Sequence, residues 1–150
     1  MCEVNFVAVA TLEDEEKSTH MQAYILSHQA AMLESTGQVE KAIELNKKAY
    51  EMRLTEDPLK ENLLAALENN LGYNYNTAND HETSLEWFYK SRDRFLASSR
   101  NDKPDWPHFV KANIARCLVY LVRYSEARDL LKIAITSFKE ETPLDWAMIA

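Results

Sequence analysis

The stretch that decides the fold is Leu-Glu-Asn-Asn-Leu-Gly-Tyr-Asn-Tyr, residues 67–75. Its large residues Leu67, Leu71 and Tyr75 are four apart, which places them on one face of a helix. Gly72 follows Leu71 directly, and a residue without a side chain at this position permits another helix to come close. The stretch therefore predicts a helix that packs tightly against a neighbouring helix.

The small residue in this stretch recurs at a nearly constant interval along the chain. Ala30, Gly72 and Ala115 lie 42 and 43 residues apart. Two later positions on the same register are also small in every copy, and they are occupied by Ala42, Ser84 and Ala127, and by Ala49, Ser91 and Ala134. Small residues are needed where helices of a hairpin cross or where hairpins stack. The register therefore predicts three copies of a helical hairpin.

The composition agrees with an all-α fold. Only 2 Gly and 4 Pro occur in 150 residues, too few for the turns of a β fold. Apolar periodicity predicts helices at about 12–36, 38–53, 58–78, 81–98, 105–122 and 124–140. The apolar face of the first is expected to comprise Met21, Tyr24, Ile25, Met32 and Leu33. We expect an N-terminal extension at 1–19, hairpins at 20–54, 58–98 and 104–141, and the start of a further helix at 142–150.

The repeat resembles the tetratricopeptide repeat (TPR) superfamily, in the long-period form of about 42 residues found in kinesin light chains and signalling ATPases. Leu71-Gly72 with Tyr75 matches the first-helix pattern, and the small residues seven apart match the second. The family's first large residue falls on Leu26, Glu68 and Lys111, so the apolar role is expected one residue earlier, on Ile25, Leu67 and Val110. The resemblance implies a right-handed α-α superhelix of about three hairpins plus a partial fourth.

The resemblance also implies a concave groove lined by the first helices. The candidate partner-binding residues that it assigns to this groove are His28, Asn69, Asn70, Tyr73, Asn76, Asn113, Arg116 and Val119. Carboxamides both donate and accept hydrogen bonds, so a row of Asn can pair with the backbone of an extended peptide. The alternative is that Asn70 and Asn113 bond only to neighbouring helices. Arg116 alone does not make the basic clamp with which some family members hold a C-terminal carboxylate.

The sequence carries no pattern typical of catalysis. Its two glycines are too isolated for a phosphate-binding loop, and the four His have no metal-ligand spacing with the cysteines. Cys117 lies in an apolar helical stretch and is expected in the core, with Phe88. His81 falls where the other copies have Val39 and Tyr124, so it is expected to be half-buried. No enzyme activity, metal or cofactor is predicted.

Charge and cysteine content limit the partners and the compartment. Acids outnumber bases by 24 to 17, giving a net charge of −7 and disfavouring nucleic acid as a partner. No apolar run reaches the length of a membrane span. Two unrelated cysteines favour a cytoplasmic protein. We expect a non-catalytic module that binds a protein or peptide. The alternative is a structural or sensor repeat segment of a larger ATPase-linked protein, and self-association through exposed terminal hairpins is plausible in either case.

Overall fold

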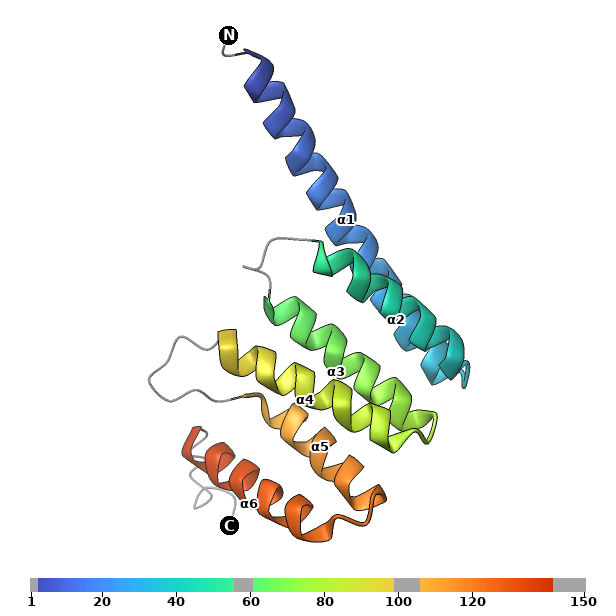
Figure 1. Ribbon diagram of the computed structural model, residues 1–150, viewed down its shortest axis with the longest axis vertical. Coiled ribbons are helices and arrows are strands. Elements are labelled where there is room, and N and C mark those ends of the chain that lie inside the picture. Colours follow the sequence, from blue (N-terminus) through green and yellow to red (C-terminus); the bar gives the residue numbers. More distant parts are fainter. Residues whose placement is uncertain (1–2, 56–60, 99–105, 142–150) are drawn as a thin grey trace, which may run out of the picture.

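The computed structural model describes residues 3–55, 61–98 and 106–141, and this part of the chain is entirely helical apart from short turns. The helices follow one another as three stacked hairpins (Figure 1), and each hairpin packs on the next through α2 against α3 and α4 against α5. The predicted all-α superhelix of helical hairpins is confirmed. The helices are α1 (Glu3–Ser35), α2 (Val39–Leu54), α3 (Glu61–Thr77), α4 (His81–Ser98), α5 (His108–Tyr120) and α6 (Tyr124–Glu141).

The first helix is longer than the periodicity indicated. α1 has 33 residues, against 16 in α2, and its first half runs beyond the hairpins as one continuous helix (Figure 1). The stretch expected as an extension at 1–19 is therefore helical from Glu3 onward. The predicted helix start near residue 58 and the predicted helix after residue 142 lie outside the described residues.

The nine small residues of the repeat are all buried, as their register predicts. The closest approach occurs at Gly72, where a Cβ atom would lie 2.6 Å from the ring of Phe88. The hydroxyls of Ser84 and Ser91 donate hydrogen bonds of 2.7 Å to the carbonyls of Gly72 and Ala65 in α3. The small residues thus bring α3 and α4 close enough for side chains of one helix to bond to the backbone of the other.

The turns inside the hairpins also repeat. Gly37, Asn79 and Val122 occupy the same register and all have a positive φ, of 79°, 64° and 62°. The N–H of each bonds to the carbonyl three residues earlier, and the next N–H bonds to the carbonyl five residues before it, which is the Schellman pattern of helix ends. The left-handed conformation costs little free energy for Gly, but it strains the backbone of a β-branched residue such as Val. Backbone geometry is thus conserved between the copies even where the residue type is unfavourable.

The predicted apolar face of the first helix is wrong for most of its members. Met21, Tyr24, Ile25 and Met32 are between 46% and 70% exposed, and only Leu33 is partly buried. The equivalents of Ile25 in the later copies, Leu67 and Val110, are buried as expected. They are covered because α3 and α5 each have a preceding hairpin against them, whereas no hairpin precedes α1 in the described chain.

We predict that Gly72→Ala lowers the free energy of unfolding by about 1–2 kcal/mol, because the added methyl displaces a fully buried ring. In an ordinary helix position the same change is stabilising, by about 1 kcal/mol. Urea unfolding of the wild type and the variant measures the difference.

The matched control for Gly72→Ala is the same substitution in a Phe88→Leu background, because the third copy combines Ala115 with Leu131 at these two positions. We expect the loss to shrink or vanish there. Equal losses in both backgrounds would show that the contact with Phe88 is not the cause.

Candidate functional site

Polar side chains of α1, α3 and α5 form two hydrogen-bonded pairs, which together extend across the three hairpins. We call Ser27, Asn69, Asn70 and Asn113 the amide row. Asn70 donates to Ser27 Oγ at 3.4 Å, and Asn113 donates to Asn69 Oδ1 at 3.0 Å. The spacings of 43 and 44 residues show that each bond links one first helix to the first helix before it. Asn70 and Asn113 therefore do bond within the stack, as the alternative interpretation expected, although a carboxamide can make more bonds than these.

Tyr73 and Arg116 lie beside the amide row. Arg116 donates to Asn113 Oδ1 at 3.0 Å, and its guanidinium lies 5.0 Å from the centre of the Tyr73 ring. The Tyr73 side chain is 39% exposed. One turn further along α3, Thr77 donates to Glu34 Oε1 of α1 at 3.0 Å. The row therefore continues as a polar surface that includes one aromatic ring and charges of both signs.

The remaining three predicted groove residues, His28, Asn76 and Val119, make other contacts or are exposed. A ring nitrogen of the exposed His28 lies 3.0 Å from the Tyr24 carbonyl in its own helix. Asn76 Oδ1 lies 3.0 Å from Nδ1 of the His81 ring, at the turn into α4, and as an amide oxygen it can only accept. Val119 is 45% exposed near the end of α5. His28 differs from Asn70 and Asn113 because no earlier first helix lies beside it.

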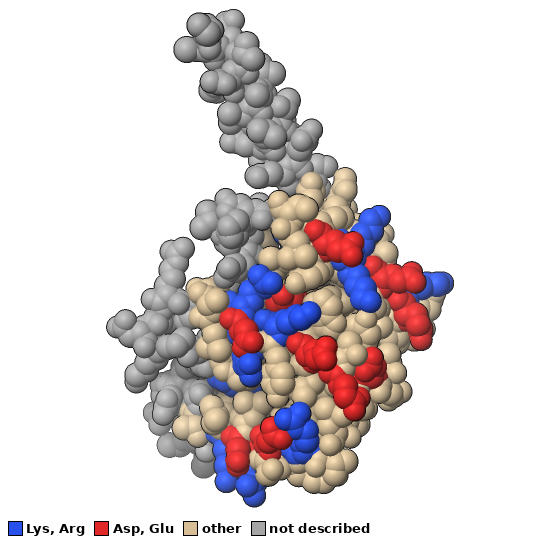
Figure 2. Space-filling view, in the orientation of Figure 1, with Lys and Arg blue, Asp and Glu red and all other residues tan. Residues whose placement is uncertain are grey.

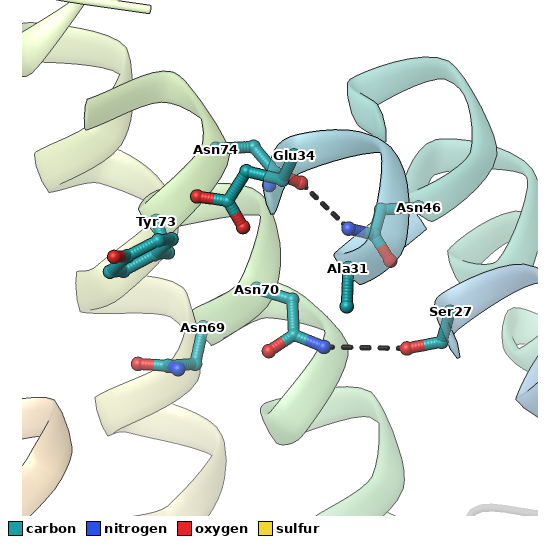
Figure 3. Close-up of a pocket in the computed structure, with 8 residues that line it drawn as sticks. All are labelled: Ser27, Ala31, Glu34, Asn46, Asn69, Asn70, Tyr73 and Asn74. Atoms are coloured by element: carbon teal, nitrogen blue, oxygen red, sulfur yellow. Dashed lines mark hydrogen bonds between the residues drawn. The ribbon is translucent and has the colours of Figure 1, made fainter. Parts of the chain in front are cut away.

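A pocket of about 170 Å³ is sunk beneath the first part of the row (Figure 3). At its base Asn46 of α2 donates to Asn74 Oδ1 of α3 at 2.6 Å, and each of these side chains is 2% exposed. The Oδ1 atom of Asn46 has no hydrogen-bond partner in the described chain. The lining residues are Ser27, Ala31, Glu34, Asn46, Asn69, Asn70, Tyr73 and Asn74.

The pocket wall also carries a carboxylate. Glu34 is partly buried, and burial raises the pKa of its carboxyl group, while the Thr77 hydrogen bond and the Arg116 charge act in the opposite direction. In Figure 3 the carboxylate reaches toward Tyr73 and Asn70, and Asn46 Oδ1 points to the side where Ala31 and Ser27 lie. The lining of the pocket thus includes two acceptor groups, the Glu34 carboxylate and the orphan Asn46 Oδ1, beside carboxamides that both donate and accept.

Asn46 and Asn74 were not among the predicted site residues. The repeat register holds the signal that could have found them, because Asn46 is equivalent to Phe88 and Leu131, and Asn74 to Met32 and Cys117. At the junction between the second and third hairpins, Phe88 and Cys117 belong to one apolar cluster. Two carboxamides at the corresponding places of the first junction therefore mark a polar interruption of the core.

A second pocket has a volume of about 380 Å³, and an ion pair forms part of its lining. The carboxylate of Glu68 is 1% exposed, and Arg94 donates to both of its oxygens at 2.8–3.0 Å. Tyr50 donates to the same carboxylate at 3.1 Å. The hydrogen bond with Glu68 raises the pKa of Arg94, and burial followed by the Glu68 charge raises that of Tyr50. These groups join α2, α3 and α4, which is a structural role.

The position at which the family has its first large residue thus holds a buried charged residue in two of the three copies. Glu68 and Lys111 are each 1% exposed, although only Leu67 and Val110 were expected inside. The ammonium of Lys111 lies 5.4 Å from the centre of the Trp106 ring. Both charges are tolerated because each has a partner from a neighbouring segment.

Reactive groups are few in the described ranges. They contain no cluster of three or more His, Cys, Asp or Glu suited to a metal ion. Cys117 is fully buried, donates to the His81 carbonyl at 2.9 Å, and has a thiol pKa raised by burial. His81 is half-buried and stacks on Tyr120 at 4.5 Å. The core placements predicted for Cys117 and Phe88 and the half-buried placement of His81 are confirmed. No helix among the described residues is long and apolar enough to span a membrane.

Comparison with known proteins identifies the fold. No protein-family model matches the sequence, and no curated protein matches it. Among solved structures, a kinesin light chain-like protein of Podospora anserina with TPR-like repeats superposes on 81% of the chain, with a TM-score of 0.67 and 16% identity. The TPR domain of Arabidopsis FLU also superposes on 81%, with a TM-score of 0.66 and 16% identity.

The fold is that of a tetratricopeptide-repeat array. The chain spans 57% of the length of the Podospora TPR protein and 98% of the FLU TPR domain. The three hairpins described above therefore have the fold of stacked TPR units. At 16% identity this likeness concerns the fold alone.

We predict that Arg94→Ala lowers the free energy of unfolding by about 2–3 kcal/mol, because it leaves the Glu68 carboxylate buried without its counterion. Replacing both partners, as Glu68→Met with Arg94→Met, is expected to recover most of this loss. Arg128→Ala is the matched control, since its pair with Asp129 is about two-thirds exposed and contributes less than about 0.5 kcal/mol. A double variant as unstable as Arg94→Ala alone would contradict the argument. Urea denaturation gives all three values.

Proposed function

We propose that this TPR array is a non-catalytic protein-interaction module that binds an extended peptide along the amide row. The observation that supports this most directly is the row itself: four polar side chains, none fully exposed, cross three hairpins on the first helices. Their mutual hydrogen bonds hold the carboxamides in fixed orientations. A ligand that pairs with them therefore loses little of its binding free energy to ordering the protein.

The amide row suits a peptide backbone better than a particular side chain. A peptide group presents one donor and one acceptor, and a carboxamide complements both. A single exchanged hydrogen bond contributes only about 0.5–1.5 kcal/mol, so the row alone gives weak binding. Tyr73, with 39% of its side chain exposed beside the row, supplies flat apolar area of the kind that anchors many interfaces.

The surface charge favours a protein partner over a nucleic acid. Figure 2 shows acidic and basic side chains interspersed over the face in view, without a patch of one sign. The net charge of −7 would repel a phosphate backbone. We infer a protein or peptide ligand on these grounds.

Linear peptides selected from a random library on the intact chain provide the probe. We predict that Tyr73→Ala weakens the binding of such peptides about tenfold, the loss typical of a moderate interface anchor. Fluorescence anisotropy with labelled peptides measures the dissociation constants. Tyr124→Ala is the matched control, because this side chain is 60% exposed on α6, away from the row. Equal affinity of the wild type and Tyr73→Ala for every selected peptide would refute groove binding.

A second candidate role is that of a segment in a longer repeat stack. It is supported by the apolar face of α1, where Ile25 and Met32 are 46% and 70% exposed at the positions that a preceding hairpin covers in α3 and α5. Such a face suits a further hairpin, supplied by the same protein or by a second copy of this chain.

We therefore predict that the chain self-associates at high micromolar concentration, and that Ile25→Glu with Met32→Glu makes it monomeric. Sedimentation velocity measures the distribution. The control variant, Ala66→Glu with Thr136→Glu, adds the same charge at exposed positions of α3 and α6 and is expected to self-associate like the wild type. If both double variants behave alike, the α1 face is not the contact surface.

A further inference from the structure

We propose that the pocket beneath the amide row is a subsite for a positively charged side chain, arginine or lysine, of the bound partner. The inference deepens the proposed function, since the peptide in the groove delivers this side chain. Asn46 Oδ1 and the Glu34 carboxylate would receive its N–H groups, and Tyr73 would flank it.

The buried acceptor is the first reason. The Nδ2 group of Asn46 is already used in the 2.6 Å bond to Asn74, so the orphan group is the carbonyl oxygen, which can only accept. Leaving a buried acceptor unpaired costs about 1–3 kcal/mol. The pocket therefore favours an occupant with N–H or O–H groups, and an apolar side chain would leave this cost in place.

The carboxylate is the second reason, because it selects a cation among possible donors. Thr77 bonds to Oε1 of Glu34, and burial has removed part of the water around the carboxylate, as its raised pKa reflects. A partly desolvated anion gains more from a neighbouring positive charge than an exposed one does. An acidic side chain would meet repulsion here.

Size and the aromatic wall are the third reason. A space of about 170 Å³ is large enough for a guanidinium or ammonium group with the last methylenes of its chain. Tyr73 already has a guanidinium, that of Arg116, 5.0 Å from its ring centre, which shows that this ring accepts cations in the present geometry. Arg116 is not a lining residue of the pocket, but its charge already acts on the Glu34 carboxylate, so a bound cation would share this carboxylate with Arg116.

The subsite can be tested with small probes on the intact chain. We expect N-acetyl-arginine methylamide or N-acetyl-lysine methylamide to shift the side-chain amide resonances of Asn46 and Asn70 saturably in ¹H–¹⁵N NMR spectra. A single side chain is expected to bind with a dissociation constant of about 1–10 mM. N-acetyl-norleucine methylamide, which lacks the charge and the donors, should produce no saturable shift. Comparing the dissociation constants of the arginine and lysine probes shows which cation the pocket prefers.

The decisive variant is Glu34→Gln, which keeps the oxygen that accepts from Thr77 and removes the charge. We expect it to weaken cation binding on the order of fivefold or more. Glu44→Gln is the matched control, because it removes the same charge from an exposed position of α2 outside the pocket. Unchanged affinity in Glu34→Gln, or equal shifts with the norleucine probe, would overturn the subsite. Water as the pocket's only occupant would show itself as no saturable shift with any probe.

Failure of the subsite is distinguishable from failure of the peptide groove. If selected peptides depend on Tyr73 but neither cationic probe binds, the groove stands and the cation subsite is wrong. If the probes bind as expected while no peptide depends on Tyr73, the subsite stands and peptide binding along the row is wrong.

Discussion

The contact between Gly72 and the ring of Phe88 shows the constraint on which the whole stack depends, namely that the helices of each hairpin must approach closely. A Cβ atom at Gly72 would lie 2.6 Å from the ring, and Ser84 bonds to the Gly72 carbonyl at 2.7 Å. At Gly72 this distance leaves no room even for a methyl group, and the other crossing points hold only Ala or Ser. Because the same requirement recurs in each copy, it fixes the register of the hairpins and so aligns the first helices on one surface.

The polar pocket arises where equivalent positions of this register carry different residues. The position of Phe88, which fills the core beside Gly72, holds Asn46 in the first copy, and the position of Cys117 holds Asn74 in the second. The second junction is therefore apolar, whereas the first contains a polar pocket with an orphan acceptor. The backbone is repeated, and the chemistry is set by the side chains that differ between copies.

The parts of the structure that the sequence predicted are those set by short-range geometry and repeated three times, namely the small crossing residues and the helix order. The parts that it missed depend on a partner distant in sequence. Ile25 is exposed because no hairpin precedes α1 in the described chain, although its own residue type favours burial. Glu68 is buried because Arg94, 26 residues away, neutralises it. The bond of Asn70 to Ser27, 43 residues away, likewise could not be read from local periodicity.

The Asn46–Asn74 pair is the strongest physical reason to regard the first junction as a site. An apolar contact at these positions, like that of Phe88 with Cys117, would leave no orphan oxygen and would bury more apolar surface. The amide row differs in this respect, because its hydrogen bonds contribute to stacking whether or not a ligand is present. A buried acceptor that stability does not require, placed directly beneath the amide row, supports the cation subsite proposed above. In that proposal the row positions the peptide, and the pocket selects its side chain.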